Sequence, residues 1–227
     1  MRPLDSLPAV DAVVIGAGVI GCAVARVLSH RGLQVYVLEA DAAEGQGLTS
    51  RNSGVVHSGL YYPPDSRKAQ SCIRGQELLW DWVEQRGVPH RITGKLVVAR
   101  DSAEVTALHA LYDNARAAGA KSVERISGSA VSNIEPALPP TREALYCART
   151  GIVDPVAFTR SLRQDAEAAG ATVLFGARVR SLETGPPFYL ETSRGPLCAD
   201  IVVNAGGLNA DRLAHSVAPD LPDHHAC

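Results

Sequence analysis

The sequence predicts an α/β fold with a parallel sheet, and two observations near its start support this. An apolar run at residues 12–15 enters a glycine-rich turn, and a helical pattern then continues to a stop at Gly32. A second apolar run follows directly and ends in Glu39. This order of strand, helix and strand is a βαβ unit. Both strands are continuously apolar rather than alternating, as expected of parallel strands that are buried on both faces.

Three further helices are expected from apolar stripes at helical spacing. They cover residues 66–86, residues 101–118 and the stretch from Pro155 to a stop at Gly170. The second begins with a possible capping box, in which Asp101 pairs with Glu104. In the third, Asp154 is a suitable cap directly before a proline at the first helical position.

The remaining segments are predicted to be strands and connections. Strand-like patterns occupy residues 94–100, 171–175, 178–184, 188–193 and 197–207. Residues 127–142 contain Glu135-Pro136 and Pro139-Pro140, which predicts a turn-rich connection. Residues 215–227 show no periodicity, so we expect an irregular tail there.

The composition is that of an ordinary globular protein. The chain has 227 residues, of which 46% are hydrophobic and 20% charged, and its formal net charge is −2. This charge gives no sign of a nucleic-acid or membrane-surface partner. The longest uncharged run, residues 12–25, is broken by glycines and too short for a membrane-spanning helix, so no transmembrane segment is expected. The start of the chain does not have the pattern of a signal or transit peptide.

The cysteines and histidines favour neither a disulfide framework nor a metal site. Five cysteines are scattered along the chain, and none forms a Cys-x-x-Cys pair. We interpret them as reduced thiols in a reducing compartment, which predicts a cytoplasmic protein. The pair His224-His225 has no second set of ligands in view, so no metal site is expected.

The glycine-rich turn carries the first functional signal. Gly16, Gly18 and Gly21 match the pattern G-x-G-x-x-G between a strand and a helix. These glycines allow a tight turn, the approach of a pyrophosphate and close packing of helix on strand, and the helix N-terminus attracts the phosphates. Glu39 has the spacing of an acid that binds ribose hydroxyls, which disfavours NADP but does not separate NAD from FAD. The alternative interpretation is a glycine turn without a ligand.

The segment after the Glu39 strand shows neither the periodicity of a helix nor that of a strand. It is the part of the chain that most specifically indicates a protein family. It reads TSRNSGVVHSGLYYPPDSRKAQSCIRG and is followed, in order, by GKLVVA, GIVDP and ADIVVNAGGLNADRLA. With the glycine turn, these segments resemble the FAD-dependent oxidoreductases of the D-amino-acid oxidase superfamily over about residues 12–214. Within it, the chain is most similar to the L-2-hydroxyglutarate dehydrogenase/oxidase group. The resemblance implies FAD as the cofactor and a Rossmann-like FAD-binding domain.

The resemblance also implies which residues contact the cofactor. In such folds the segment after the acid passes the FAD pyrophosphate and reaches the flavin, and small side chains let backbone amides approach both. We expect contacts from Ser50, Arg51, Asn52, Ser53 and Gly54 in this segment, and from Val179, Gly206 and Gly207 farther along.

His57 is the catalytic candidate that the resemblance implies. Oxidation of a 2-hydroxy acid removes the hydroxyl proton as hydride goes to the flavin, and a histidine that titrates near neutrality suits the first task. The alternatives are a structural ring and a covalent attachment point for FAD. Tyr61 and Tyr62 are expected to donate hydrogen bonds to a substrate carboxylate, or one of them to pack.

The implied function is FAD-dependent oxidation of a small 2-hydroxy acid, L-2-hydroxyglutarate to 2-oxoglutarate. The electron acceptor is oxygen, a quinone or a carrier protein, and a quinone would go with peripheral association with a membrane. Two alternatives stay open: an amine or amino-acid oxidase of the same superfamily, and a non-catalytic FAD-binding remnant.

The expected domain organisation is discontinuous. Residues 9–92 and 151–214 form the FAD-binding domain, residues 93–150 form an inserted, incomplete α+β substrate domain, and residues 215–227 form the tail. Members of the group are usually longer and end with a glycine-rich loop at the flavin, so we expect this chain to be truncated at its C-terminus.

Overall fold

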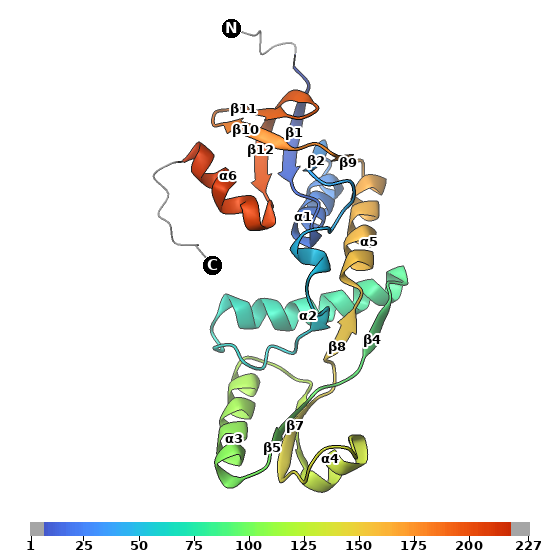
Figure 1. The fold of residues 1–227 in the computed structure, drawn as a ribbon, viewed down its shortest axis with the longest axis vertical. Helices are drawn as coiled ribbons and strands as arrows, with labels where there is room; N and C mark the ends of the chain where they lie inside the picture. The colour runs from blue at the N-terminus through green and yellow to red at the C-terminus, as the bar shows by residue number, and fades with distance from the viewer. Residues whose placement is uncertain (1–6, 219–227) are drawn as a thin grey trace. The chain divides into compact units, whose positions relative to one another are not determined.

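The computed structural model describes residues 7–218. The chain forms two compact units. The described part of the first unit is residues 7–52 and 155–218, and the second unit is residues 53–154 (Figure 1). These limits differ from the expected domain limits, because residues 53–92 and 151–154 belong to the second unit. His224, His225 and Cys227 lie outside the described residues.

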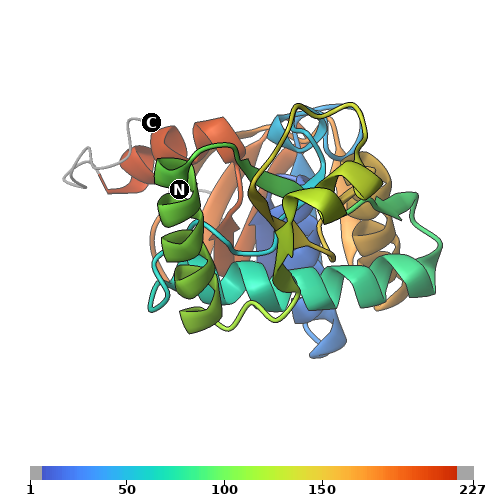
Figure 2. The ribbon, with the colours of Figure 1, turned by 90° about the horizontal axis from the view of Figure 1, so that it is seen from below.

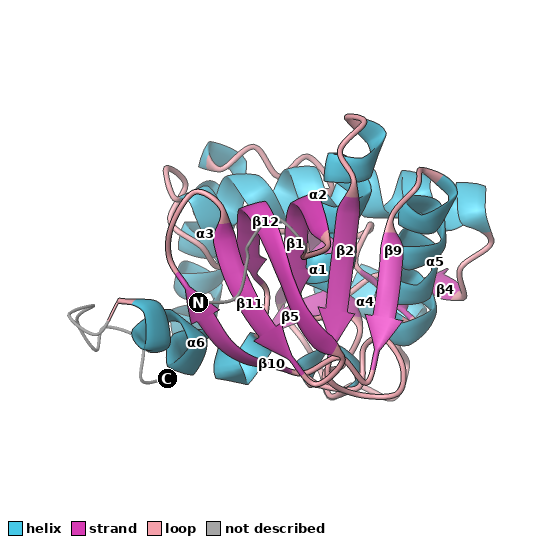
Figure 3. Ribbon diagram, turned by 90° about the horizontal axis from the view of Figure 1, so that it is seen from above, coloured by secondary structure: helices cyan, strands magenta, loops and turns pink. Residues whose placement is uncertain are grey.

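The first unit contains a six-stranded sheet in the order β10-β11-β12-β1-β2-β9 (Figure 3). Its strands are β1 (Ala9–Ile15), β2 (Val35–Glu39), β9 (Thr172–Phe175), β10 (Val179–Glu183), β11 (Phe188–Thr192) and β12 (Gly195–Asn204). Strand β1 pairs in parallel with both β12 and β2, and β2 pairs in parallel with β9. Strands β10, β11 and β12 form antiparallel pairs. The parallel centre confirms the predicted α/β class, and the antiparallel edge is an addition to it.

Burial explains why the central strands read as continuous apolar runs. Val13 and Val14 of β1 and Val35 and Val37 of β2 are all almost completely buried, although neighbouring residues in a strand point to opposite faces. Both faces of this part of the sheet are therefore covered, as the absence of alternation predicts.

The helices of the first unit are α1 (Val19–His30), α5 (Pro155–Ala168) and α6 (Ala210–Val217), with short 3₁₀ helices η2 (Leu48–Ser50) and η3 (Gly207–Asn209). Helices α1 and α5 pack against each other, and Arg26 Nε donates to Asp165 Oδ2 at 2.7 Å. The prediction of an irregular tail from residue 215 is wrong for its first residues, because α6 continues to Val217. Leu213 and Val217 are one helical turn apart and pack against the sheet core, which stabilises this helix.

The second unit contains two three-stranded antiparallel sheets and three helices. The first sheet has the order β3 (Val55–Val56), β8 (Gly151–Val153), β4 (His90–Ile92), and the second has the order β5 (Leu96–Ala99), β7 (Glu143–Cys147), β6 (Val123–Ser127). The helices are α2 (Arg67–Arg86), α3 (Ser102–Ala117) and α4 (Gly128–Ile134), and α2 is long and unbroken in Figures 1 and 2. The pairing of β8 with β3 and β4 explains why residues 53–92 group with this unit.

Two local predictions for the second unit can be compared with its geometry. Asp101 Oδ1 accepts a hydrogen bond from the Glu104 amide at 2.9 Å, while Glu104 Oε2 accepts from the Arg100 amide rather than that of Asp101. The turn-rich connection predicted for residues 127–142 is wrong for its first half, which forms α4. Ser127 Oγ caps this helix by accepting from the Ala130 amide, a start signal that the prolines farther on obscured.

The described residues also bear on membrane spans, thiols and metals. Among them, no helix combines the length and apolar character that crossing a bilayer requires. Cys22, Cys72, Cys147 and Cys198 are free thiols. Within residues 7–218 there is no cluster of three or more histidine, cysteine or acidic side chains that could hold a metal ion.

Trp80 should contribute more to stability than the other tryptophan of the second unit. Its side chain is fully buried on α2, and Nε1 donates to the Arg149 carbonyl at 3.0 Å. Trp80→Ala is expected to lower the free energy of unfolding by about 3–5 kcal/mol, measured by urea denaturation. Trp82→Ala is the matched control, because this ring is half-buried and stacks against Arg86. Equal losses for the two variants would contradict the packing described here.

Candidate cofactor site and catalytic residues

The turn between β1 and α1 is packed so closely that side chains are excluded. Gly16 has φ of +103°, and a Cβ atom there would lie 2.5 Å from the Ala205 carbonyl oxygen. A Cβ on Gly21 would lie only 1.9 Å from the Gly16 carbonyl oxygen. Both overlaps are with backbone atoms, so the two glycines are required for the turn and for the packing of α1 on it.

The N-terminus of α1 is suited to an anion. Its cap residue is Gly18, which provides no side-chain cap, and no acidic side chain lies in the first turn. The first amides of a helix have no acceptor within the helix, and they attract phosphate. One of them, the Val19 amide, donates to Thr49 Oγ1 at 3.1 Å. Thr49 is buried and was not among the predicted site residues, although it opens the segment that the sequence singled out.

Glu39 is held against the same turn by both carboxylate oxygens. Oε2 accepts from the Ala17 amide at 2.7 Å, and Oε1 accepts from the Asp41 amide at 2.8 Å. The residue is half-buried, and each oxygen of an ionised carboxylate can accept a second hydrogen bond. The carboxylate is therefore oriented and still able to accept from the two hydroxyls of a ribose.

The loop after β2 is tied to the turn and to α5. The Gly45 amide donates to the Ala17 carbonyl at 3.0 Å. The buried Glu44 forms ion pairs with Arg160 at 2.8 Å and Arg163 at 3.4 Å. Burial alone would raise the pKa of Glu44, but the hydrogen bond from Arg160 and the charge of Arg163 outweigh it and hold the pKa below its ordinary value. Nothing in the sequence distinguishes Glu44 from a solvated acid.

Three residues at the end of this loop, which were predicted to contact the cofactor, use their side chains to hold the loop's own backbone. Ser50 Oγ and the Arg51 guanidinium both donate to the Gly47 carbonyl, at 3.2 and 3.3 Å. Asn52 Nδ2 donates to the Thr49 carbonyl at 2.6 Å. Any contact of this segment with a cofactor therefore falls mainly to its backbone.

The predicted cofactor contacts of the first unit that lie far along the sequence are found at the same edge of the sheet as the glycine turn. The Ala205 amide donates to the Ile15 carbonyl at 2.9 Å, which brings the loop of Gly206 and Gly207 to the glycine turn. The Ala177 amide donates to the Glu39 carbonyl at 2.7 Å, and Val179 begins β10 two residues later. The structure therefore gathers Gly16, Gly18, Gly21, Glu39, Gly206 and Gly207 around one strand-to-helix turn, with Val179 near the end of β2.

The other predicted residues belong to the second unit. Ser53 is exposed, whereas Gly54 is buried with φ of +64°, and its carbonyl accepts from the Val153 amide at 2.9 Å. His57, Tyr61 and Tyr62 follow on the same segment.

The backbone at His57 is held by a buried polar network. The His57 carbonyl accepts from Gln76 Nε2 at 3.1 Å and from Cys72 Sγ at 3.4 Å, both on α2. Gln76 Nε2 also lies 3.3 Å from Ser58 Oγ, which is 2.7 Å from Thr150 Oγ1. A satisfied network of this kind fixes the position of the segment. His57 itself is exposed to solvent.

The environment of His57 favours the neutral imidazole. Partial burial lowers the pKa of His57 below its ordinary value, and the positive charge of Lys95 lowers it further. A neutral imidazole can accept a proton, so His57 is suited to act as a base near neutral pH.

Each of the two tyrosines is paired with a lysine. Lys95 Nζ donates to Tyr61 Oη at 3.4 Å and lies 4.6 Å from the centre of its ring. Lys68 Nζ lies 4.5 Å from the centre of the Tyr62 ring. Tyr61 is 55% exposed, so its hydroxyl is accessible. Lys95 lies in the strand-like segment GKLVVA, where only tertiary structure shows that it reaches Tyr61.

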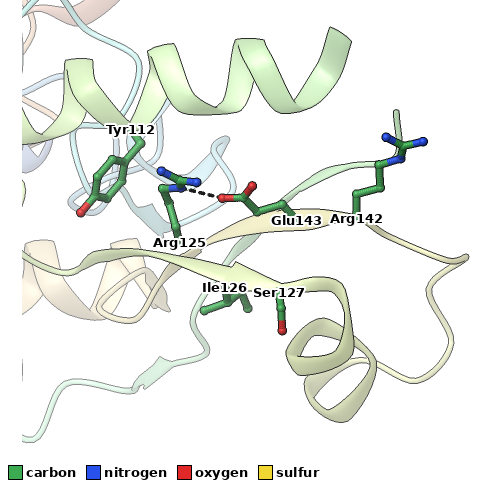
Figure 4. Close-up of a pocket in the computed structure, with 6 residues that line it drawn as sticks. All are labelled: Tyr112, Arg125, Ile126, Ser127, Arg142 and Glu143. Carbon is green, nitrogen blue, oxygen red and sulfur yellow. Dashed lines mark hydrogen bonds and ion pairs between the residues drawn. The ribbon is translucent and has the colours of Figure 1, made fainter. Parts of the chain in front are cut away.

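A separate hollow of about 470 Å³ lies on the second unit and contains none of the predicted site residues. It is lined by Tyr112, Arg125, Ile126, Ser127, Arg142 and Glu143 (Figure 4). Arg125 Nε donates to Glu143 Oε1 at 2.6 Å, and His109 Nε2 is 2.9 Å from the other carboxylate oxygen. The hydrogen bonds from Arg125 and then His109 hold the pKa of Glu143 below its ordinary value. Arg125 and Glu143 offset each other's charge in this hollow.

The glycine turn, the N-terminus of α1 and the oriented acid define a dinucleotide-binding α/β protein. The chain matches the family model described as FAD dependent oxidoreductase over residues 11–226. It is 32% identical to the mitochondrial L-2-hydroxyglutarate dehydrogenase of Caenorhabditis elegans over 216 residues, which cover 92% of this chain and 50% of the relative. It is 43% identical to the Arabidopsis thaliana protein of the same name over 153 residues, which cover 67% of this chain and 32% of the relative.

A solved structure agrees with the fold. The L-α-glycerophosphate oxidase of Mycoplasma pneumoniae with FAD bound is 25% identical, has a TM-score of 0.85, and is matched over 93% of this chain and 57% of that one. The chain therefore belongs to the FAD-dependent oxidoreductase family, which confirms the predicted family and its cofactor, FAD. The chain spans about half the length of the curated relatives it matches.

Proposed function

We propose that this chain serves the FAD-dependent oxidation of a 2-hydroxy acid, with L-2-hydroxyglutarate as substrate and 2-oxoglutarate as product. The observation that carries the proposal is His57: its backbone is held by Gln76 and Cys72, and its pKa is lowered, so it can act as a base. The names of the relatives from Caenorhabditis elegans and Arabidopsis thaliana support this choice of substrate.

The residues of the first unit fit FAD. The amides at the start of α1 would bind the pyrophosphate, because Gly16 and Gly21 leave no side chain in their way. Glu39 would accept from the ribose hydroxyls. Backbone groups of the segment from Ser50 to Gly54, the loop of Gly206 and Gly207, and the start of β10 at Val179 would supply the remaining contacts. When bound, FAD supplies the acceptor for the hydride that leaves C2 of the substrate.

Glu39→Gln is expected to weaken FAD binding about tenfold to a hundredfold, the value of a charge-assisted hydrogen bond. The variant also turns an amide group toward one of the two backbone amides that the carboxylate accepts from. Asp41→Asn is the control, because Asp41 is an exposed acid two residues away. The dissociation constants are measured by titration with FAD. An unchanged value for Glu39→Gln would remove this acid from the site.

In the chemical step, the residues of the chain handle the proton and the substrate. An unprotonated imidazole nitrogen of His57 accepts the hydroxyl proton as the C2–O bond becomes a carbonyl. Partial burial and the charge of Lys95 keep that nitrogen free of a proton near neutral pH. The hydroxyls of Tyr61 and Tyr62 would donate to a substrate carboxylate.

The electron acceptor and the location are part of the proposal. Oxygen, a quinone or a carrier protein returns the flavin to its oxidised form, and a quinone would require peripheral contact with a membrane. The free thiols in the described part of the chain are compatible with the cytoplasmic location that we propose. The relatives' names place those proteins in mitochondria.

The proposal is tested by anaerobic mixing of the flavin-loaded protein with candidate substrates. We expect L-2-hydroxyglutarate to bleach the flavin and L-glutamate and glycine to leave it oxidised. Bleaching by the amino acids instead would identify an amino-acid oxidase. A protein that holds FAD but is reduced by none of them would identify a non-catalytic remnant.

A further inference from the structure

Lys95 is a fixed, half-buried residue directly before β5. Its amide donates to the Cys147 carbonyl at 3.2 Å, and its carbonyl accepts from the Cys147 amide at 2.8 Å. The preceding Gly94 has φ of +70°, and a Cβ atom there would lie 2.7 Å from the Tyr146 ring. The backbone that carries the Lys95 side chain is therefore set by a strand pair and by a turn that requires glycine.

Among the described residues, the ammonium group of Lys95 has no counter-ion. Within residues 7–218, no carboxylate lies at ion-pair distance from Lys95 Nζ, whose partner is Tyr61 Oη at 3.4 Å. A half-buried ammonium without an opposite charge is unfavourable, and an anion would relieve this. A phenol that accepts from the lysine still has its own proton to donate.

The described groups that Lys95 acts on or contacts include no carboxylate. They are the His57 imidazole, the Cys72 thiol of α2, the Cys147 thiol of β7 and the Tyr61 phenol. Burial raises the pKa of both thiols, which stay protonated near neutral pH, and Lys95 acts on both. These four groups do not balance the charge of Lys95, whereas a bound anion would.

We infer that Lys95 binds a carboxylate of the substrate, with the Tyr61 hydroxyl as the second donor. This inference rests on the proposed function for the identity of the substrate, a 2-hydroxydicarboxylic acid. A carboxylate oxygen that accepts from both the ammonium and the phenol forms charge-assisted hydrogen bonds and supplies the missing negative charge. Lys95 then has two effects: it holds the substrate, and its charge adds to the lowering of the His57 pKa that partial burial causes.

The second effect provides a readout that does not depend on turnover. Because the Lys95 charge lowers the pKa of His57, a carboxylate bound to Lys95 should raise that pKa toward its ordinary value. Lys95→Met should raise it even without ligand, and added ligand should then change it little. A lysine that only stacks on the Tyr61 ring would give no ligand-dependent shift.

The test is NMR titration of the His57 ring in the purified chain with L-2-hydroxyglutarate, a probe that requires no flavin chemistry. Lys95→Met is expected to weaken binding about tenfold to a hundredfold, and Lys95→Arg to retain most of it. Lys68→Met, which removes the exposed lysine at Tyr62, is the matched control and should bind like the wild type.

The outcomes separate this inference from the proposed function. Equal affinity in Lys95→Met, a larger loss in Lys68→Met, or no response of His57 in the wild type would overturn the role of Lys95. Lys95-dependent binding without reduction of the flavin would overturn the proposed oxidation and leave the carboxylate site standing. If L-2-hydroxyglutarate reduces the flavin of Lys95→Met with an unchanged KM, the carboxylate site at Lys95 is overturned and the proposed oxidation stands.

Discussion

Replacing His57 with alanine is expected to slow reduction of the bound flavin by L-2-hydroxyglutarate about 10²–10⁴-fold, the contribution of a positioned general base. The loss should fall on the reduction rate itself, because His57 is the proton acceptor that we propose. FAD binding should be unchanged, since the residues that fit the pyrophosphate and the ribose lie in the first unit. Anaerobic stopped-flow measurement of the flavin absorbance separates the two quantities.

The same reaction should depend on pH through the His57 imidazole. Partial burial and then the Lys95 charge lower the pKa of His57. The neutral form is the active base, so the rate should hold at neutral pH and fall as the pH drops through this lowered pKa. His109→Ala is a useful control, because this histidine pairs with Glu143 at the separate hollow. A normal rate in His57→Ala would assign His57 to packing, and loss of the flavin would assign it to holding the cofactor.

Gly21→Ala should abolish tight FAD binding although it adds a single methyl group. The new Cβ would lie 1.9 Å from the Gly16 carbonyl oxygen, a backbone atom that cannot rotate away. Helix α1 must then move off the turn, and its first amides move with it. We expect a loss at or beyond the upper end of the about 1–3 kcal/mol that overpacked sites show, which is about a hundredfold or more in affinity.

Gly75→Ala is the matched control for this variant. Gly75 is an exposed residue of helix α2, and a Cβ atom added to it would have no neighbour within 4 Å. Its affinity for FAD should equal that of the wild type. Similar FAD affinity in both variants would show that the packing of α1 on the turn does not form the cofactor site.

The features that could be predicted from the sequence are those encoded by residues close together along the chain. The glycine turn, Glu39 and the parallel centre of the sheet are specified by residues within one βαβ unit, and local pattern predicts them well. The start of α5 at Pro155 and the cap of α3 at Asp101 are local signals of the same kind.

The features that sequence reasoning missed depend on contacts between distant residues. Thr49 meets Val19, Glu44 meets Arg160, and Lys95 meets Tyr61, and each pair is brought together only by the tertiary fold. The unit limits differ from the expected domain limits because β8 pairs with strands far earlier in the chain. Helix α4 was missed because prolines shortly after it dominated the pattern of the whole segment.

We propose that this chain binds FAD at the start of α1, with Glu39 on the ribose. The most direct measurement is the backbone amide NMR spectrum of the labelled chain as FAD is added. We predict saturable shifts at Ala17, Gly18 and Gly21, at the loop of Gly206 and Gly207, and at Glu39. Shifts confined to other parts of the chain would show that FAD binds elsewhere, and no shifts at a large excess of FAD would show that the chain does not bind it.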